Sequence, residues 1–88
     1  MKRWFEQLAE ALGALLLPRE VVVSSSAIDR VRYEPQRKAL IVSFRNGERT
    51  YEYGSVPART YRSFLRSDSK GRFFVREIRN RYPFRRLS

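Results

Sequence analysis

The clearest pattern of apolar and polar positions along the chain is a pair of β-rich runs in its middle. Residues 39–44 (ALIVSF) and 50–53 (TYEY) are rich in β-branched and aromatic side chains, which favour strands. Between them lies Asn46-Gly47, a dipeptide that tolerates positive φ at both central positions of a type I′ turn. The pattern predicts a β-hairpin with a two-residue loop.

The register of this hairpin decides which of its side chains face the core. With a two-residue loop, Leu40 pairs with Tyr53 and Val42 with Tyr51, and paired residues share a face of the sheet. We therefore expect both tyrosines to be core residues rather than exposed platforms for stacking. A three-residue loop would reverse this assignment, because a shift of one residue turns every side chain to the other face.

Extended chain is also predicted before the hairpin. Residues 21–23 and 28–33 are strand candidates, and the three consecutive serines between them indicate a bend or bulge. Residues 35–38 then form a turn. Together with the hairpin, these segments predict an antiparallel sheet of three or four strands.

Apolar residues return at helical spacing after the hairpin. Residues 57–67 predict a helix with Pro57 at its first position. Its packing face gathers Tyr61, Phe64 and Leu65 together with this proline.

A second helix is predicted over about residues 70–82, with Ser69 as a candidate N-cap. Pro83 ends it and leaves residues 84–88 as a short basic tail. The apolar arc of this helix is formed by Phe74, Val75, Ile78 and Tyr82.

An amphipathic helix is predicted at the N-terminus, over residues 3–16. Trp4, Phe5 and Leu8 begin an apolar stripe at spacings of three and four, and Pro18 ends the helix. Its polar face is acidic, whereas helices that bind membranes carry Lys and Arg there, so we expect the stripe to pack on the domain's own core. A contact between two copies of the chain is a further alternative.

These elements predict one α+β domain. The two C-terminal helices pack on the face of the sheet that bears the paired side chains of the hairpin, and the N-terminal helix completes or extends this core. We divide the chain into residues 1–18, the N-terminal helix, and residues 19–88, the domain proper.

The residue inventory excludes most catalytic chemistry. The chain has no cysteine and no histidine, so it lacks thiolate nucleophiles, imidazole bases, disulfides and the usual zinc ligands. An S-x-x-K motif from Ser67 to Lys70 falls in a turn of a domain too small to supply the rest of such a site. We expect a protein that is not an enzyme and uses no metal or cofactor. Glu6 and Glu10 interrupt the N-terminal apolar stretch, which argues against an export signal or membrane span and indicates a cytoplasmic protein.

Positive charge is concentrated in the last third of the chain. The net charge is +10, and residues 55–88 hold ten basic residues against two acidic ones. Sixteen of the nineteen basic residues are arginine, whose planar guanidinium suits phosphates. On both predicted C-terminal helices the arginines lie opposite the packing face: Arg59, Arg62 and Arg66 on the first, Arg72, Arg76 and Arg79 on the second.

These two stripes of like charge have two explanations. They are either solvated faces, which is what most runs of charge are, or a surface for a polyanion. Solvated faces usually mix signs, and like charges at helical spacing repel each other by a few tenths of a kcal/mol per pair. A bound polyanion relieves that repulsion, so we favour the second explanation.

Several short motifs follow one another in a recognisable order over about residues 22–87. They are Ser25-Ser26-Ala27-Ile28, Tyr33, the hairpin from Phe44 to Gly47, Tyr51 and Tyr53 as a central Tyr-x-Tyr, Val56-Pro57, Tyr61, Leu65, Ser69-Lys70-Gly71, Ile78-Arg79 and Tyr82-Pro83. This order resembles the KTSC domain, a short module named for the C-terminus of some lysyl-tRNA synthetases and also found as a stand-alone bacterial protein. RNA binding has been suggested for that family, so the resemblance implies RNA as a partner.

We predict a non-catalytic module that binds RNA or another single-stranded nucleic acid. Phe73, on the flank of its helix near the arginines, is a candidate for base stacking or for the core. The alternative is a protein-interaction module, in which the arginines bind an acidic protein and the N-terminal helix provides docking or homo-oligomerisation. The residues expected to contact phosphates are all basic: Arg59, Arg62, Arg66, Lys70, Arg72, Arg76, Arg79, Arg85 and Arg86.

Overall fold

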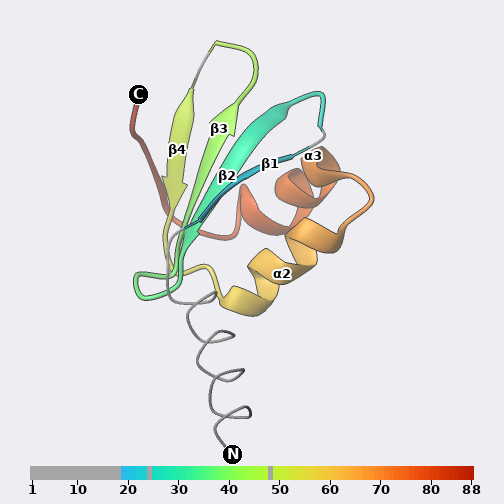
Figure 1. The fold of residues 1–88 in the computed structure, drawn as a ribbon. Helices are drawn as coiled ribbons and strands as arrows, with labels where there is room; N and C mark the ends of the chain where they lie inside the picture. The colour runs from blue at the N-terminus through green and yellow to red at the C-terminus, as the bar shows by residue number, and fades with distance from the viewer. Residues whose placement is uncertain (1–18, 24, 48) are drawn as a thin grey trace, which may run out of the picture.

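The computed structural model describes residues 19–23, 25–47 and 49–88. It contains an antiparallel sheet in which each strand pairs with its neighbour in sequence, in the order β1-β2-β3-β4-β5. The strands are β1 (Arg19–Val22), β2 (Ile28–Glu34), β3 (Ala39–Phe44), β4 (Thr50–Tyr53) and β5 (Phe84–Arg86). Figure 1 labels β1, β2, β3 and β4 across the sheet. The helix predicted over residues 3–16, and the contacts expected of it, lie outside the described residues.

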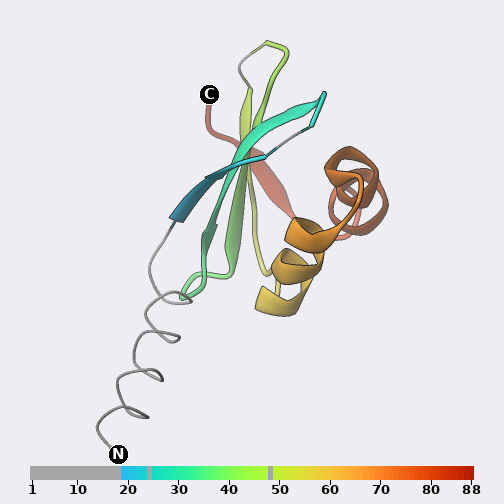
Figure 2. The ribbon, with the colours of Figure 1, turned by 45° about the vertical axis from the view of Figure 1, so that its right-hand side comes forward.

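Three helical segments lie between β4 and β5 in sequence. They are α2 (Ala58–Arg66), α3 (Lys70–Phe73) and a π-helix, η1 (Phe74–Ile78), which continues directly from α3. All three lie on the same side of the sheet (Figure 2). The predicted α+β class and the placement of both C-terminal helices on one face are therefore confirmed.

The core fills the space between the helices and this face of the sheet. Phe64 from α2 and Ile78 from η1 are fully buried and meet side chains of the three central strands. Between β4 and α2, Val56 closes the end of this layer. The sheet supplies Ile28, Val31, Leu40 and Val42, all exposed by at most 1%.

The hairpin register is the predicted one. Leu40 pairs with Tyr53 and Val42 with Tyr51, and all four side chains belong to or pack against the core. Tyr53 is 4% exposed, whereas Tyr51 is only half-buried. The turn differs from the expected type I′ geometry, because Gly47 has a φ of 83° but Asn46 does not have a positive φ.

The prediction of three or four strands was wrong, because the C-terminal tail forms a fifth. Phe84 pairs with Tyr53 in β4, which would otherwise be the exposed edge of the sheet. Backbone hydrogen bonds from Gly54 N–H to the Pro83 carbonyl (2.9 Å) and from Leu87 N–H to the Thr50 carbonyl (2.7 Å) bracket this pairing. An unpaired edge leaves a row of backbone donors and acceptors free. This explains why the short basic tail pairs with β4.

The second C-terminal helix departs from the expected geometry. Ser69 is its N-cap as predicted, since its Oγ accepts a hydrogen bond from Arg72 N–H at 3.3 Å. The helix ends at Ile78 instead of residue 82, and a hydrogen bond from Arg79 N–H to the carbonyl of Phe74 (2.9 Å) closes a π-turn. A π-turn encloses one more residue between its hydrogen-bonded groups than a turn of α-helix does. The side chains that follow therefore point in other directions than in a regular α-helix.

The shift moves one residue of the predicted apolar arc out of the core. Phe74 and Ile78 are buried as expected and Tyr82 packs against the core, but Val75 is 51% exposed. Phe73 is packed against the core and meets the ring of buried Phe64 edge to face, with centroids 5.9 Å apart. Phe73 therefore packs in the fold, and its second predicted role, base stacking, stays a prediction.

The irregularity expected before β2 is present as a bend at Ser26 and Ala27. Ser25 Oγ accepts hydrogen bonds from the backbone N–H groups of Ala27 and Ile28, each at 3.2 Å. The pairing of β2 with β3 then shifts register between Ile28 and Arg30, which is the signature of a bulge.

Two core tyrosines make the stability of the fold depend on pH in the alkaline range. Burial raises the pKa of Tyr33 and, together with the neighbouring Tyr51, that of Tyr53, while the charges of Arg62 and Arg79 partly oppose these shifts. The unfolded chain therefore releases these protons first, at about pH 10. The stability that they contribute is complete below that pH and is lost as the pH rises through the folded pKa values.

We expect the melting temperature to fall above about pH 10, and to fall less steeply in Tyr53→Phe, which lacks one of the ionising hydroxyls. Thermal unfolding followed by circular dichroism between about pH 8 and pH 12 measures this. Identical pH profiles for the two proteins would contradict the role assigned to Tyr53.

Candidate nucleic-acid interface

Helix α2 presents its arginines to solvent because its apolar residues are taken up by the core. Phe64 is fully buried, and Tyr61 stacks on Tyr33 of β2 with ring centroids 4.7 Å apart. With this face fixed against the sheet, the opposite side of the helix must face outward. The three predicted residues Arg59, Arg62 and Arg66 are all exposed.

The chain turns sharply between α2 and α3, and this turn is held by its own polar groups. Ser67 Oγ donates a hydrogen bond to the carbonyl of Phe64 (2.8 Å). Lys70 Nζ donates to the carbonyl of Ser67 at 2.6 Å. Lys70, predicted to contact phosphate, thus closes the C-terminal end of α2, and its ammonium meets the backbone of Ser67 rather than the serine hydroxyl.

The turn brings the end of α2 and the outer side of α3 and η1 around one hollow of about 590 Å³. Three of the predicted arginines, one from each helical segment, line it. Asp68 lines it too and is its one carboxylate among the described residues. The full lining is Ser63, Arg66, Ser67, Asp68, Ser69, Arg72, Phe73 and Arg76. We call this feature the arginine hollow.

The arginines of the hollow keep most of their charge available. In the described part of the chain, Arg66 and Arg72 make no ion pair, and Arg76 pairs only with its neighbour Glu77 (3.3 Å). Both side chains of that pair are solvent-accessible, and such exposed pairs contribute at most about 1 kcal/mol, so it is easily exchanged for another anion. The hollow therefore has a net positive charge.

The last three predicted arginines do not join this hollow. Arg79 lies on the other side of η1, between the helix and the sheet. Arg86 lies at the edge of the sheet and donates a hydrogen bond from Nε to the backbone of Ser88 (2.6 Å). Arg85, next to it in β5, pairs with Glu52 and so shares the face of the sheet that is turned away from the helices.

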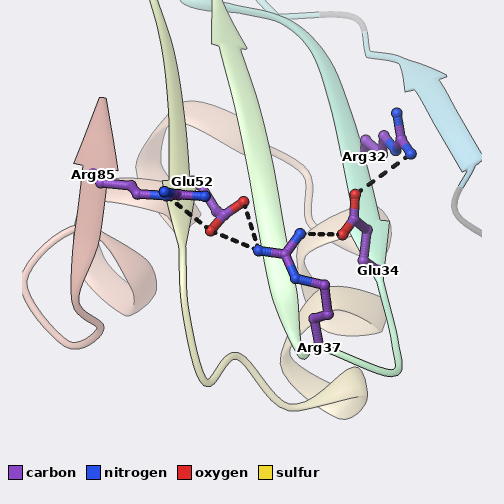
Figure 3. A network of polar contacts seen from close by, with 5 residues as sticks. All are labelled: Arg32, Glu34, Arg37, Glu52 and Arg85. Atoms are coloured by element: carbon purple, nitrogen blue, oxygen red, sulfur yellow. Dashed lines mark hydrogen bonds and ion pairs between the residues drawn. The ribbon is translucent and has the colours of Figure 1, made fainter. Parts of the chain in front are cut away.

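That outer face carries a network of ion pairs rather than a free cationic surface (Figure 3). Glu52 accepts from Arg85 (3.3 Å) and from Arg37 (3.1 Å), and Arg37 also pairs with Glu34. Arg32 completes the network through Glu34 at 3.4 Å. The hydrogen bond to Glu34, followed by the charge of Glu52, raises the pKa of Arg37. All three arginines of this network are thus paired with a carboxylate.

The hollow also contains residues that the sequence pattern did not single out. Asp68 is one of the two acidic residues in the last third of the chain, and Ser63 is an uncharged residue of α2. Their position between Arg62 and Arg72 in sequence was the available signal. A turn was predicted at Ser67–Ser69, but the way in which it brings its two flanking helices together is not encoded in the local sequence pattern.

None of the helices in residues 19–88 that the structure describes is long and apolar enough to cross a membrane.

Comparison with known proteins identifies relatives over most of the domain. Residues 24–82 match the family model of the KTSC domain. An uncharacterized protein of Stutzerimonas stutzeri (strain A1501) is 34% identical over 56 residues, which are 64% of this chain and 78% of that protein. The crystal structure of a KTSC domain protein from Yersinia pestis is similar with a TM-score of 0.77 and 35% sequence identity, and the match covers 82% of this chain and 100% of that one.

Proposed function

The chain belongs to the KTSC domain family, and on this premise we propose that it is a non-catalytic module that binds RNA or another single-stranded nucleic acid. The binding surface consists of the arginine hollow and the exposed side of α2. Its phosphate contacts come from Arg59, Arg62, Arg66, Arg72 and Arg76.

The observation that carries this proposal is the difference between the two faces of the molecule. On the outer face of the sheet, each arginine of the network makes an ion pair with Glu34, Glu52 or both. Around the hollow, Asp68 is the one lining carboxylate among the described residues. Arg66 and Arg72 make no ion pair there, and Arg76 pairs only with its neighbour Glu77. Concentrating unmatched like charges costs electrostatic energy in the free protein, and a bound chain of phosphates recovers that energy.

Arginine also suits this kind of ligand in its geometry. Its guanidinium presents a planar fork of donors that matches two oxygens of one phosphate. Arginines at helical spacing along α2 continue from the hollow at Arg66 back to Arg59, so successive phosphates of one strand find a donor. This arrangement supports contacts to the backbone of the nucleic acid and therefore weak dependence on base sequence.

We expect binding to depend steeply on salt. If these five arginines neutralise phosphates of a single strand, log K should fall against log salt with a slope of roughly −3.5, because each contact releases about 0.7 of a counterion. Fluorescence anisotropy with labelled single-stranded RNA over a series of salt concentrations measures the slope.

A duplex RNA and an acidic peptide of equal charge are the comparison ligands. If the chain binds the acidic peptide more tightly than the RNA, the partner is an acidic protein and not a nucleic acid. A slope near zero, or the absence of binding at low salt, would contradict the proposal.

A further inference from the structure

A second concavity lies on the other side of η1 from the arginine hollow. It is a groove of about 640 Å³ between this helix and the hairpin end of the sheet, within the size range of small-ligand sites. Its walls come from β3, β4, β5 and α3–η1, so segments distant in sequence meet there. We call it the aromatic groove.

Aromatic rings form most of its sheet-side wall. Phe44, Tyr51 and Phe84 follow one another across three strands, with centroids 5.8 Å apart for the first pair and 5.7 Å for the second, both edge to face. Tyr53 and Phe74 lie beneath them and are buried. Phe84 is 60% exposed and is the one aromatic residue among the exposed large apolar side chains of the described chain.

The polar lining of the groove is cationic and neutral. Arg49 and Arg79 lie at it, together with Asn46 and Asn80, which are the two asparagines of the chain. Among the described residues, no carboxylate lines this groove. It therefore combines ring faces, amide donors and acceptors, and two positive charges.

The π-turn explains why η1 contributes to this wall. In a regular helix Val75 would face the core and Arg79 would share the side of Arg72 and Arg76. The extra residue between Phe74 and Arg79 turns Val75 and Arg79 toward the groove instead. π-Turns are rare in proteins and are found frequently at functional sites.

We propose that the aromatic groove holds an unstacked base of the bound strand, with its ring against Phe84 and Tyr51. Arg49 and Arg79 contact the flanking phosphates, and Asn46 and Asn80 hydrogen-bond to the edge of the base. This inference rests on the proposed function, because the arginine hollow brings the strand to η1, whose opposite side forms the groove.

The chemistry of the groove favours a nucleotide over other ligands. A base has a π-face for the aromatic rings and polar edges for the amides, and it is tied to the negative charge that the arginines attract. A purely apolar ligand would make no contact that uses the two arginines and two asparagines, so these polar side chains would add nothing to its affinity.

The test compares two strands that share their phosphates and differ in their bases. We would measure the affinity of the full chain for an oligouridylate of about 12 nucleotides, within the range of single-strand sites, and for an abasic strand of equal length. The oligouridylate should bind about tenfold more tightly, and Phe84→Ala should abolish the difference without changing the affinity for the abasic strand.

Two further variants test whether the effect belongs to the groove: one changes a second residue of the groove, and the other is a control on the outer face of the sheet. Val75→Glu places a carboxylate at the exposed mouth of the groove and should weaken binding of the oligouridylate more than that of the abasic strand, whose phosphates it also repels. Val22→Ala removes a side chain that is 77% exposed on the outer face of the sheet, and should change neither affinity. In amide spectra, the side chains of Asn46 and Asn80 should shift on binding, whereas that of Gln36, in the turn after β2, should not.

Each outcome decides between the two proposals. Equal affinity of the two strands for the wild-type chain, with a steep dependence on salt, would overturn the groove and leave the arginine hollow standing. A preference for the oligouridylate that survives both Phe84→Ala and Val75→Glu would also overturn it. If neither strand binds at low salt, the proposed function fails and the base site fails with it.

Discussion

Replacing Arg66, Arg72 and Arg76 together by glutamine is expected to weaken the binding of single-stranded RNA by about 100-fold at about 0.1 M salt. Each lost phosphate contact removes the release of about 0.7 of a counterion, which is worth about fivefold in affinity at that salt concentration. The three side chains line one hollow, so the strand loses neighbouring contacts. The slope of log K against log salt should flatten by about two units.

The matched control is the triple variant Arg30→Gln, Arg32→Gln and Arg45→Gln. It lowers the net charge by the same amount, but its arginines are paired with Glu20, Glu34 and Asp29 on other parts of the surface. Exposed pairs of this kind contribute little to stability, so both variants should remain folded. Equal losses of affinity in the two would show that attraction is due to net charge and not to the hollow.

Truncating Phe64 to alanine is expected to destabilise the domain by roughly 3–5 kcal/mol, because it leaves a cavity at the centre of the contact between α2 and the sheet. The residue is fully buried and meets Phe73 of α3, so the loss loosens both helices together. A domain of this length has about 4–13 kcal/mol of total stability. The melting temperature should fall by roughly 15–30 °C.

Phe84→Ala is the control for this substitution, since it removes the same side chain from an exposed position at the groove. It should cost about 1 kcal/mol, in proportion to the smaller apolar area that it removes from contact. Thermal unfolding of both variants by circular dichroism provides the comparison. A Phe64→Ala protein that melts within a few degrees of Phe84→Ala would contradict the position given to α2.

Much of the architecture follows from local sequence signals. The pairing of Val42 with Tyr51 was predictable because Asn46-Gly47 restricts the loop length, and the parity of a strand then settles which side chains share a face. The outward stripe of α2 was predictable from the spacing of Tyr61, Phe64 and Leu65. The cap at Ser69 was predictable because its side chain can satisfy a free N–H at the start of a helix.

The candidate site was predictable only in part. The charge pattern indicated arginines on two helices, and these residues are exposed as expected. Nothing in the pattern indicated that Arg85 would pair with Glu52, since the two are far apart in sequence and meet only because β5 joins β4. The binding of Lys70 to a backbone carbonyl likewise depends on how the turn closes.

The sequence by itself determined the α+β class, the hairpin register and the outward face of α2, because each depends on periodicity and turn chemistry within a few neighbouring residues. Only the tertiary structure decided the fifth strand, the π-turn at Phe74–Ile78 and the grouping of arginines into a hollow. The physical reason is that these features arise from competition between distant segments for the same backbone edge or the same space in the core. β5 forms because β4 has unpaired backbone groups, and Val75 turns outward because the π-turn shifts the faces of η1.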